Sequence, residues 1–272
     1  MKSPAFILTA LALVVLGIYL FVQAPAPLPE EGAVTGKTVS VDHVLTLVAA
    51  ENDIVRALWT KEIVGAGKKA GLAFDEHWQD ESLEAGPLPA LFLRLAAASL
   101  EKNPVPLSVF LGSDFPISPS NAFQGRQIEM FELIKQDLQP QFFFEEDTEL
   151  YTAMFADVAS VEGCVSCHNE HADSPKVDWV LNDVMGATTW AYPKQEMTND
   201  EFLEVITAVR HSFRDAYIAY LDKVDTFENP PEIGENWPRD GYYLPTAEVF
   251  LAEFESRASA NTVDLLLAQA EE

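Results

Sequence analysis

The sequence predicts an α+β domain in which long helices flank a small antiparallel sheet. Apolar residues recur at helical spacing over about 40–69 and again over 200–224. Two short aromatic-rich runs, 141–145 and 150–156, flank an acidic turn and predict a β-hairpin. Thr198-x-x-Glu201 is a capping box, which marks the start of the second long helix. Helices and a hairpin of this kind favour separate helical and sheet layers.

The first half of the chain divides at glycines and prolines. Residues 24–39 are rich in Pro, Ala and Gly and are predicted to form a flexible linker. The helix over about 40–69 ends near Gly65, Gly67 and Gly71. Pro87-Leu88-Pro89 opens another helix that runs to about residue 101.

The second half contains most of the predicted sheet. Residues 107–111 form its first strand, and a turn-rich loop leads to a short helix over about 124–137. After the hairpin, residues 178–181 and 184–192 are predicted as further strands. We therefore expect a domain over 40–225. Residues 226–272 form a C-terminal extension that becomes helical from about Ala247.

The chain is strongly acidic. It has 43 acidic and 17 basic residues, which gives a formal net charge of −26. A field of this sign repels nucleic acids and anionic lipid surfaces, so we expect no nucleic-acid partner. It permits a cationic protein partner, although an exported protein that simply repels its own copies would have the same charge.

Residues 164–168, CVSCH, form the most informative motif. They contain both cysteines of the chain. Two thiols at this spacing can add to the two vinyl groups of a haem, and the histidine that follows can bind the iron. The motif therefore predicts one covalent haem c, held by Cys164 and Cys167 with His168 as the proximal iron ligand. A zinc ribbon is less favoured, because it would need a second cysteine pair. A thioredoxin-type pair would open a helix after a strand in an α/β pattern.

The N-terminus predicts export. Residues 5–22 are uncharged and apolar, with Lys2 before them and Glu30 and Glu31 after them. This order favours a single-pass inner-membrane anchor over residues 1–23, with the haem domain in the periplasm. Val22-Gln23-Ala24 resembles a cleavage site, so a soluble periplasmic protein after signal removal is the alternative. Either arrangement places the cysteines where haem is attached in bacteria.

Residues 40 to about 225 resemble the PAS-like c-type haem sensor domains, a former domain of unknown function found alone or fused to histidine kinases and chemoreceptors. The similarity is carried by the helix that follows the membrane segment and by three motifs: Pro116-Ile117-Ser118-Pro119-Ser120-Asn121, the CVSCHN run with Ser174-Pro175-Lys176, and Asp183-Val184-Met185-Gly186. The resemblance implies a PAS-like antiparallel sheet and a haem-based sensing role.

The chain departs from the family pattern at two points. Asp114-Phe115-Pro116 replaces the family's loop arginine. The resemblance implies a second iron ligand from a third cysteine on the N-terminal helix, as in a characterised member of the family, but this chain has no third cysteine. His77, beside Trp78, is therefore our first choice for the distal ligand, and His43 is the second. An open sixth position and a methionine ligand are the alternatives.

Cations are needed near the haem propionates. Lys176 is the preferred candidate because it lies eight residues beyond His168. The alternative for Lys176 is an ordinary ion pair with one of the many acids.

Two functions remain open at this point. The first is a redox or diatomic-gas sensor that binds haem and signals through a separate protein. The second is a single-haem electron-transfer cytochrome, acting as a shuttle or as a subunit of a respiratory assembly. We expect no enzymatic activity, because the sequence shows no nucleophile motif and no phosphate loop. A haem peroxidase would need an open iron site with a distal histidine or arginine.

Overall fold

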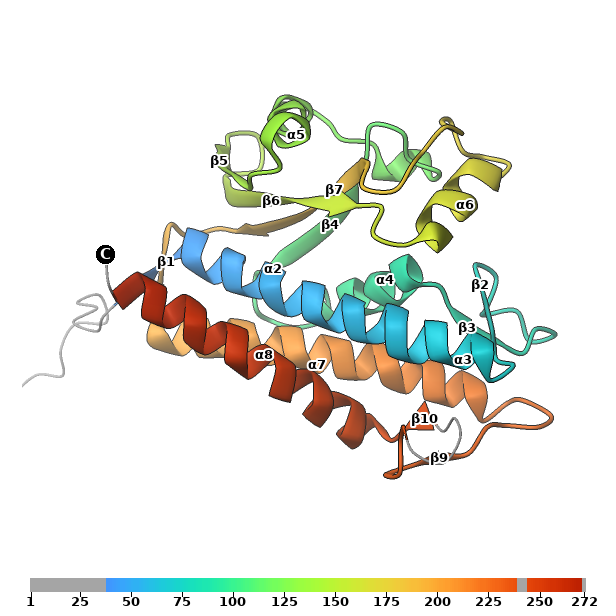
Figure 1. Cartoon of the computed structure of the whole chain (residues 1–272). Coiled ribbons are helices and arrows are strands. Elements are labelled where there is room, and N and C mark those ends of the chain that lie inside the picture. The colour runs from blue at the N-terminus through green and yellow to red at the C-terminus, as the bar shows by residue number, and fades with distance from the viewer. Residues whose placement is uncertain (1–37, 239–243, 271–272) are drawn as a thin grey trace, which may run out of the picture. The chain divides into compact units, whose positions relative to one another are not determined.

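The computed structural model describes residues 38–238 and 244–270 (Figure 1). Its helices are α2 (Val41–Leu58), the π-helix η1 (Trp59–Gly65), α3 (Ala66–Lys69), α4 (Pro89–Leu100), the 3₁₀ turn η2 (Pro119–Asn121), α5 (Arg126–Asp137), α6 (Glu162–Glu170), α7 (Asn199–Val224) and α8 (Ala247–Ala270). Its strands are β1 (Thr38–Ser40), β2 (Ala73–Asp75), β3 (Ala85–Pro87), β4 (Ser108–Gly112), β5 (Gln141–Glu145), β6 (Leu150–Val158), β7 (Val184–Tyr192), β8 (Glu196–Thr198), β9 (Ile233–Gly234) and β10 (Leu244–Pro245).

The central sheet has four antiparallel strands in the order β4-β7-β6-β5. The hairpin β5–β6 pairs Gln141 with Met154 and Glu145 with Leu150, which confirms the predicted hairpin. The mixed α and β architecture with an antiparallel sheet and long helices is confirmed as well. The prediction of a strand over 178–181 is wrong. A tight turn occupies that stretch instead, in which Asp183 N–H donates to the carbonyl of Val180.

Side chains alternate between the two faces of the sheet, as the pleat requires. Along β6, Tyr151, Ala153 and Phe155 pack with the main core, which α2, α4 and α7 form on one face. Met154 points to the opposite face and packs with Phe143 beneath α5. Figure 1 shows α5 on one side of the sheet and the long helices on the other.

An aromatic cluster lies at the centre of the main core. Trp59 is fully buried in η1 and stacks on Phe92 with a centroid separation of 4.3 Å. The rings of Tyr217 and Tyr220 meet it edge-on at 6.2 and 5.3 Å. The helix predicted over 40–69 is therefore continuous, but Trp59–Gly65 winds as a π-helix before the α-helix resumes at Ala66.

The two last long helices begin as the sequence indicated. In α7 the Thr198 side chain accepts from the Glu201 N–H at 3.2 Å, and Glu201 accepts from the Thr198 N–H at 2.8 Å, which confirms the capping box. Helix α8 packs on α2 and α7 through Phe250, Phe254 and Ala258, all fully or almost fully buried. The described part of the C-terminal extension therefore shares the core of the preceding residues.

The predicted membrane anchor, residues 1–23, and most of the predicted linker lie outside the described residues. In residues 38–238 and 244–270, no helix has the length and apolar content that crossing a bilayer requires.

We expect Gly186→Ala to destabilise the domain by about 2–3 kcal/mol, because the sheet leaves no room for a side chain there. A Cβ on Gly186 would lie 2.2 Å from the carbonyl oxygen of Gly112, and neither backbone can move away easily. Gly163→Ala is the matched control, since no atom lies within 4 Å of its Cβ position and alanine favours the helix. Urea unfolding should separate the two variants, and equal stabilities would contradict the packing described here.

Candidate site on helix α6

Helix α6 contains the complete CVSCH motif. Cys164, Cys167 and His168 occupy positions i, i+3 and i+4 of this helix, so their side chains share one face. The helix follows β6 and precedes β7, and these two strands are antiparallel neighbours. A thioredoxin-type motif would require an α/β unit of parallel strands, so this topology does not favour it.

The motif face of α6 is only partly covered by the rest of the protein. None of the nine residues of α6 is buried. Both thiols are free, with Cys164 half-buried and Cys167 exposed. Burial and the nearby charge of Glu76 raise the pKa of the Cys167 thiol, which keeps it protonated at neutral pH. A disulfide oxidoreductase would lower a thiol pKa instead.

His168 is held as a neutral imidazole. Burial lowers the pKa of His168, although the charge of Asp157 opposes this effect. Its Nδ1 atom is buried and has no hydrogen-bond partner in the part of the chain that the structure describes. A neutral imidazole is the form that binds a metal. A buried ring nitrogen without a partner costs free energy, which a binding partner of the imidazole would offset.

A group of charged residues lies beside the motif face. Arg56 of α2 donates to Asp157 at the end of β6 over 2.5 Å, and both side chains are partly exposed. Burial lowers the pKa of Arg56, but the charge and hydrogen bond of Asp157, together with the charges of Asp53 and Cys164, raise it overall. Asp53 lies about one helical turn before Arg56. Burial raises the pKa of Asp53, the charge of Arg56 lowers it, and the charge of Asp157 raises it. Arg56 also interacts electrostatically with Cys164, and Lys68 with Cys167. The motif face is therefore directed toward the C-terminal part of α2 and toward α3.

His171, just after α6, has a structural role. Its Nδ1 accepts the N–H of Asp173 at 3.1 Å, so that nitrogen carries no proton. Its Nε2–H is then the donor to Glu76, at 2.9 Å. This pair ties the end of α6 to the segment after β2, and it excludes His171 as an iron ligand in this conformation.

The two histidines predicted as distal ligands, His77 and His43, lie in different parts of the structure. His77 follows Glu76 in the segment that His171 contacts, and its imidazole is exposed beside the carboxylates of Asp75 and Glu76 at 3.5 and 3.8 Å. His43 lies thirteen residues before Arg56, which is about 20 Å along α2. Figure 1 shows that α2 begins at the end of the molecule opposite α6. Only His77 is therefore near the motif face.

Lys176, predicted to hold a propionate, lies in the loop after α6. Its ammonium pairs with Asp178 and lies 4.6 Å from the ring centroid of Trp179. The cations that face the cysteines are Arg56 and Lys68 instead. Sequence reasoning missed both of them, together with Asp157. Asp157 lies only seven residues before Cys164, so its position in the sequence could have identified it as a charged residue near the site.

The residues of this face fit a covalently attached haem. Two free thiols and a neutral histidine share one helix face, and none of the three side chains belongs to either core cluster. In residues 38–238 and 244–270 no cluster of three or more His, Cys, Asp and Glu residues is arranged to hold a metal ion. A haem needs no such cluster, because its porphyrin supplies four of the iron ligands.

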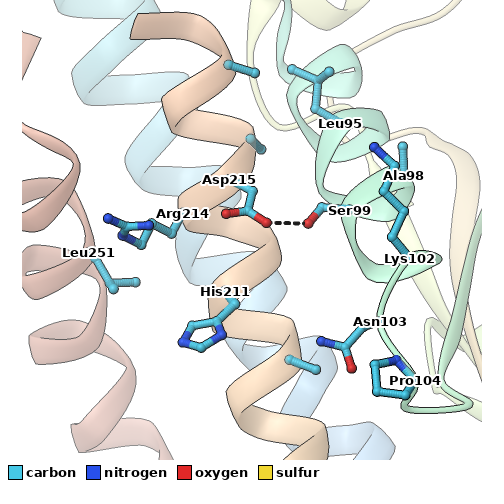
Figure 2. Close-up of a pocket in the computed structure, with 13 residues that line it drawn as sticks. Leu95, Ala98, Ser99, Lys102, Asn103, Pro104, His211, Arg214, Asp215 and Leu251 are labelled. Atoms are coloured by element: carbon cyan, nitrogen blue, oxygen red, sulfur yellow. Dashed lines mark hydrogen bonds between the residues drawn. The ribbon is translucent and has the colours of Figure 1, made fainter. Parts of the chain in front are cut away.

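A cavity of about 670 Å³ lies elsewhere, between α4, α7 and α8. The Ser99 hydroxyl donates to Asp215 across it at 2.6 Å (Figure 2). His211 and Arg214 also line it, but no residue of α6 does. The cavity is therefore separate from the motif face of α6.

A comparison with known families matches residues 41–193 to the Tll0287-like family, which is more than half of the 272 residues. The chain belongs to the Tll0287-like family. The matched range of this Tll0287-like protein begins at the first residue of α2, ends just after β7 and includes all of α6. No curated protein and no solved structure matches the chain.

Proposed function

We propose that this Tll0287-like protein is a c-type haem protein whose single haem is bound covalently by Cys164 and Cys167, with His168 as the proximal iron ligand. The observation that carries the proposal is the motif face of α6, where two free thiols and a neutral imidazole lie together outside both core clusters. A bound haem would supply an iron that changes oxidation state and can bind a diatomic gas. It would also supply the apolar packing surface that α6 lacks.

The neighbouring residues have separate roles in this proposal. Arg56 and Lys68 place positive charge beside the cysteines and are suited to holding anionic propionates. The charge of Asp157 raises the pKa of His168 and so opposes the effect of burial. His77 is the proposed distal ligand, since it lies on the segment that His171 holds near α6.

Within this function we favour a redox or diatomic-gas sensor with a PAS-like domain, anchored in the inner membrane and located in the periplasm. The loosely packed α6 supports a sensor, because a helix without buried residues can shift when its histidine changes ligation. The alternative is a single-haem electron-transfer cytochrome. Both would act through a partner protein.

We expect the wild-type chain, produced with a cytochrome c maturation system, to keep its haem through denaturing electrophoresis and acid–acetone extraction. Thioether bonds survive both treatments, whereas a haem held by ligation alone is removed. Complete loss of haem would refute the proposal. On the same sample, binding of carbon monoxide or nitric oxide to the reduced protein would support the sensor. An inert six-coordinate spectrum with fast electron exchange would support the electron carrier.

A further inference from the structure

A compact apolar surface lies on the loop that follows α6. Val177 and Val180, at 64% and 60%, are the two most exposed large hydrophobic side chains within residues 38–238. Leu181 is exposed on the same loop, and Phe115 is exposed where its ring meets that of Trp179 at 6.1 Å. We call these four residues, Phe115, Val177, Val180 and Leu181, the loop patch. Exposed hydrophobic residues are normally scattered, so their concentration here calls for an explanation.

The loop patch is held in a fixed conformation. Asn169 of α6 donates to the carbonyl of Trp179 at 3.0 Å and accepts its N–H at 2.8 Å. The Asp183 side chain accepts the N–H of Val180 at 3.0 Å. Ala159 N–H donates to the carbonyl of Asp183 at 2.9 Å, which fastens the loop to the end of β6. A surface ordered in advance loses little conformational entropy on binding, as a docking site requires.

The loop patch does not line the proposed haem site. Successive residues of an α-helix are about 100° apart, so Asn169 lies about 140° around α6 from Cys164. The hydrogen bonds from Asn169 to Trp179 therefore lie on the side of α6 that faces away from Cys164 and Cys167. A haem on the motif face would leave these hydrophobic side chains exposed.

The charges around the patch define the kind of partner. Residues 162–183 contain five carboxylates, Glu162, Glu170, Asp173, Asp178 and Asp183, against the single lysine Lys176. That lysine is already paired with Asp178. The whole chain has a formal charge of −26, so a second copy is repelled. A partner that complements this surface has apolar residues surrounded by lysines or arginines.

We propose that the loop patch is the docking surface for a basic protein partner that presents an apolar area ringed by cationic side chains. Asn169, the residue after His168, clamps this loop, so any shift of α6 would be transmitted to the partner through Asn169. The docking surface goes beyond the proposed function, and its existence does not depend on the haem.

The test uses the full haem-loaded chain and mitochondrial cytochrome c, a lysine-ringed redox protein, as the probe. Isothermal titration at an ionic strength of about 0.01 M should detect binding that weakens as salt rises to about 0.15 M. Val177→Ser with Val180→Ser should weaken binding at least about tenfold. Leu203→Ser is the matched control, because Leu203 is 59% exposed on α7, outside the patch, and should bind as the wild type does.

Three results would overturn the proposal: no binding of cytochrome c by the wild type, equal binding by the double serine variant, or an equal loss in Leu203→Ser. Haem content is measured on every sample. A double variant that cannot retain haem would show that the patch lines the cofactor, which also overturns the proposal. If the wild-type chain acquired no haem but still bound cytochrome c through the patch, the haem function would be refuted and the docking surface would stand.

Discussion

Alanine at both Cys164 and Cys167 should leave a folded protein that carries no covalent haem. The loss should be complete, because these are the only two cysteines and each thioether needs a thiol. The fold should survive because α6 contributes no buried residue to either core cluster. Haem staining of denaturing gels measures the first effect, and far-UV circular dichroism with urea unfolding measures the second.

Two controls sharpen this experiment. Ser166→Ala changes an exposed residue between the two cysteines and should keep the full haem stain. Cys164→Ala alone should retain a haem joined by one thioether, with a shifted absorption spectrum. Full haem retention in the double variant would contradict the assignment of the motif. Unfolding of the double variant before any haem is added would show instead that the cysteines support the fold.

Much of the fold could be predicted because local patterns and tertiary packing agree. The capping box at Thr198 and the hairpin around residues 146–148 are local signals, and the structure follows both. The strand predicted over 178–181 failed for a physical reason. Val177, Val180 and Leu181 suggest a buried strand, but side-chain and turn hydrogen bonds from Asn169 and Asp183 hold this stretch as an exposed loop.

The candidate site, like the fold, could be predicted only in part. The motif identifies Cys164, Cys167 and His168 by spacing alone. Their placement on a single helix was not predictable, because α6 is short and has no apolar periodicity. The Arg56–Asp157 pair joins residues 101 positions apart, and no single-sequence pattern links them. The π-helix around Trp59 depends on the rings of Phe92 and Tyr220, which come from distant segments.

Replacing Arg210 with alanine should be among the most destabilising single changes in the helical layer, at about 3–5 kcal/mol. Arg210 of α7 donates through Nε to both carboxylate oxygens of Glu51 on α2, at 3.2 and 3.1 Å. Glu51 is 1% exposed, so removing Arg210 leaves a buried carboxylate without its cation. Arg210 also lies 3.8 Å from Glu255, so the pair connects three helices.

A double variant separates the stability lost with the ion pair from the stability lost with side-chain packing. Glu51→Leu with Arg210→Met removes both charges and should recover most of the stability, because apolar side chains of similar size can fill a buried site. Arg257→Ala is the exposed control. Arg257 pairs with Glu62 and Glu253, but all three side chains are about one-third exposed, so the loss should stay within about 1 kcal/mol. If Arg210→Ala cost no more than Arg257→Ala in urea unfolding, the buried carboxylate would have to be solvated, and the packing of α2 against α7 described here would be wrong.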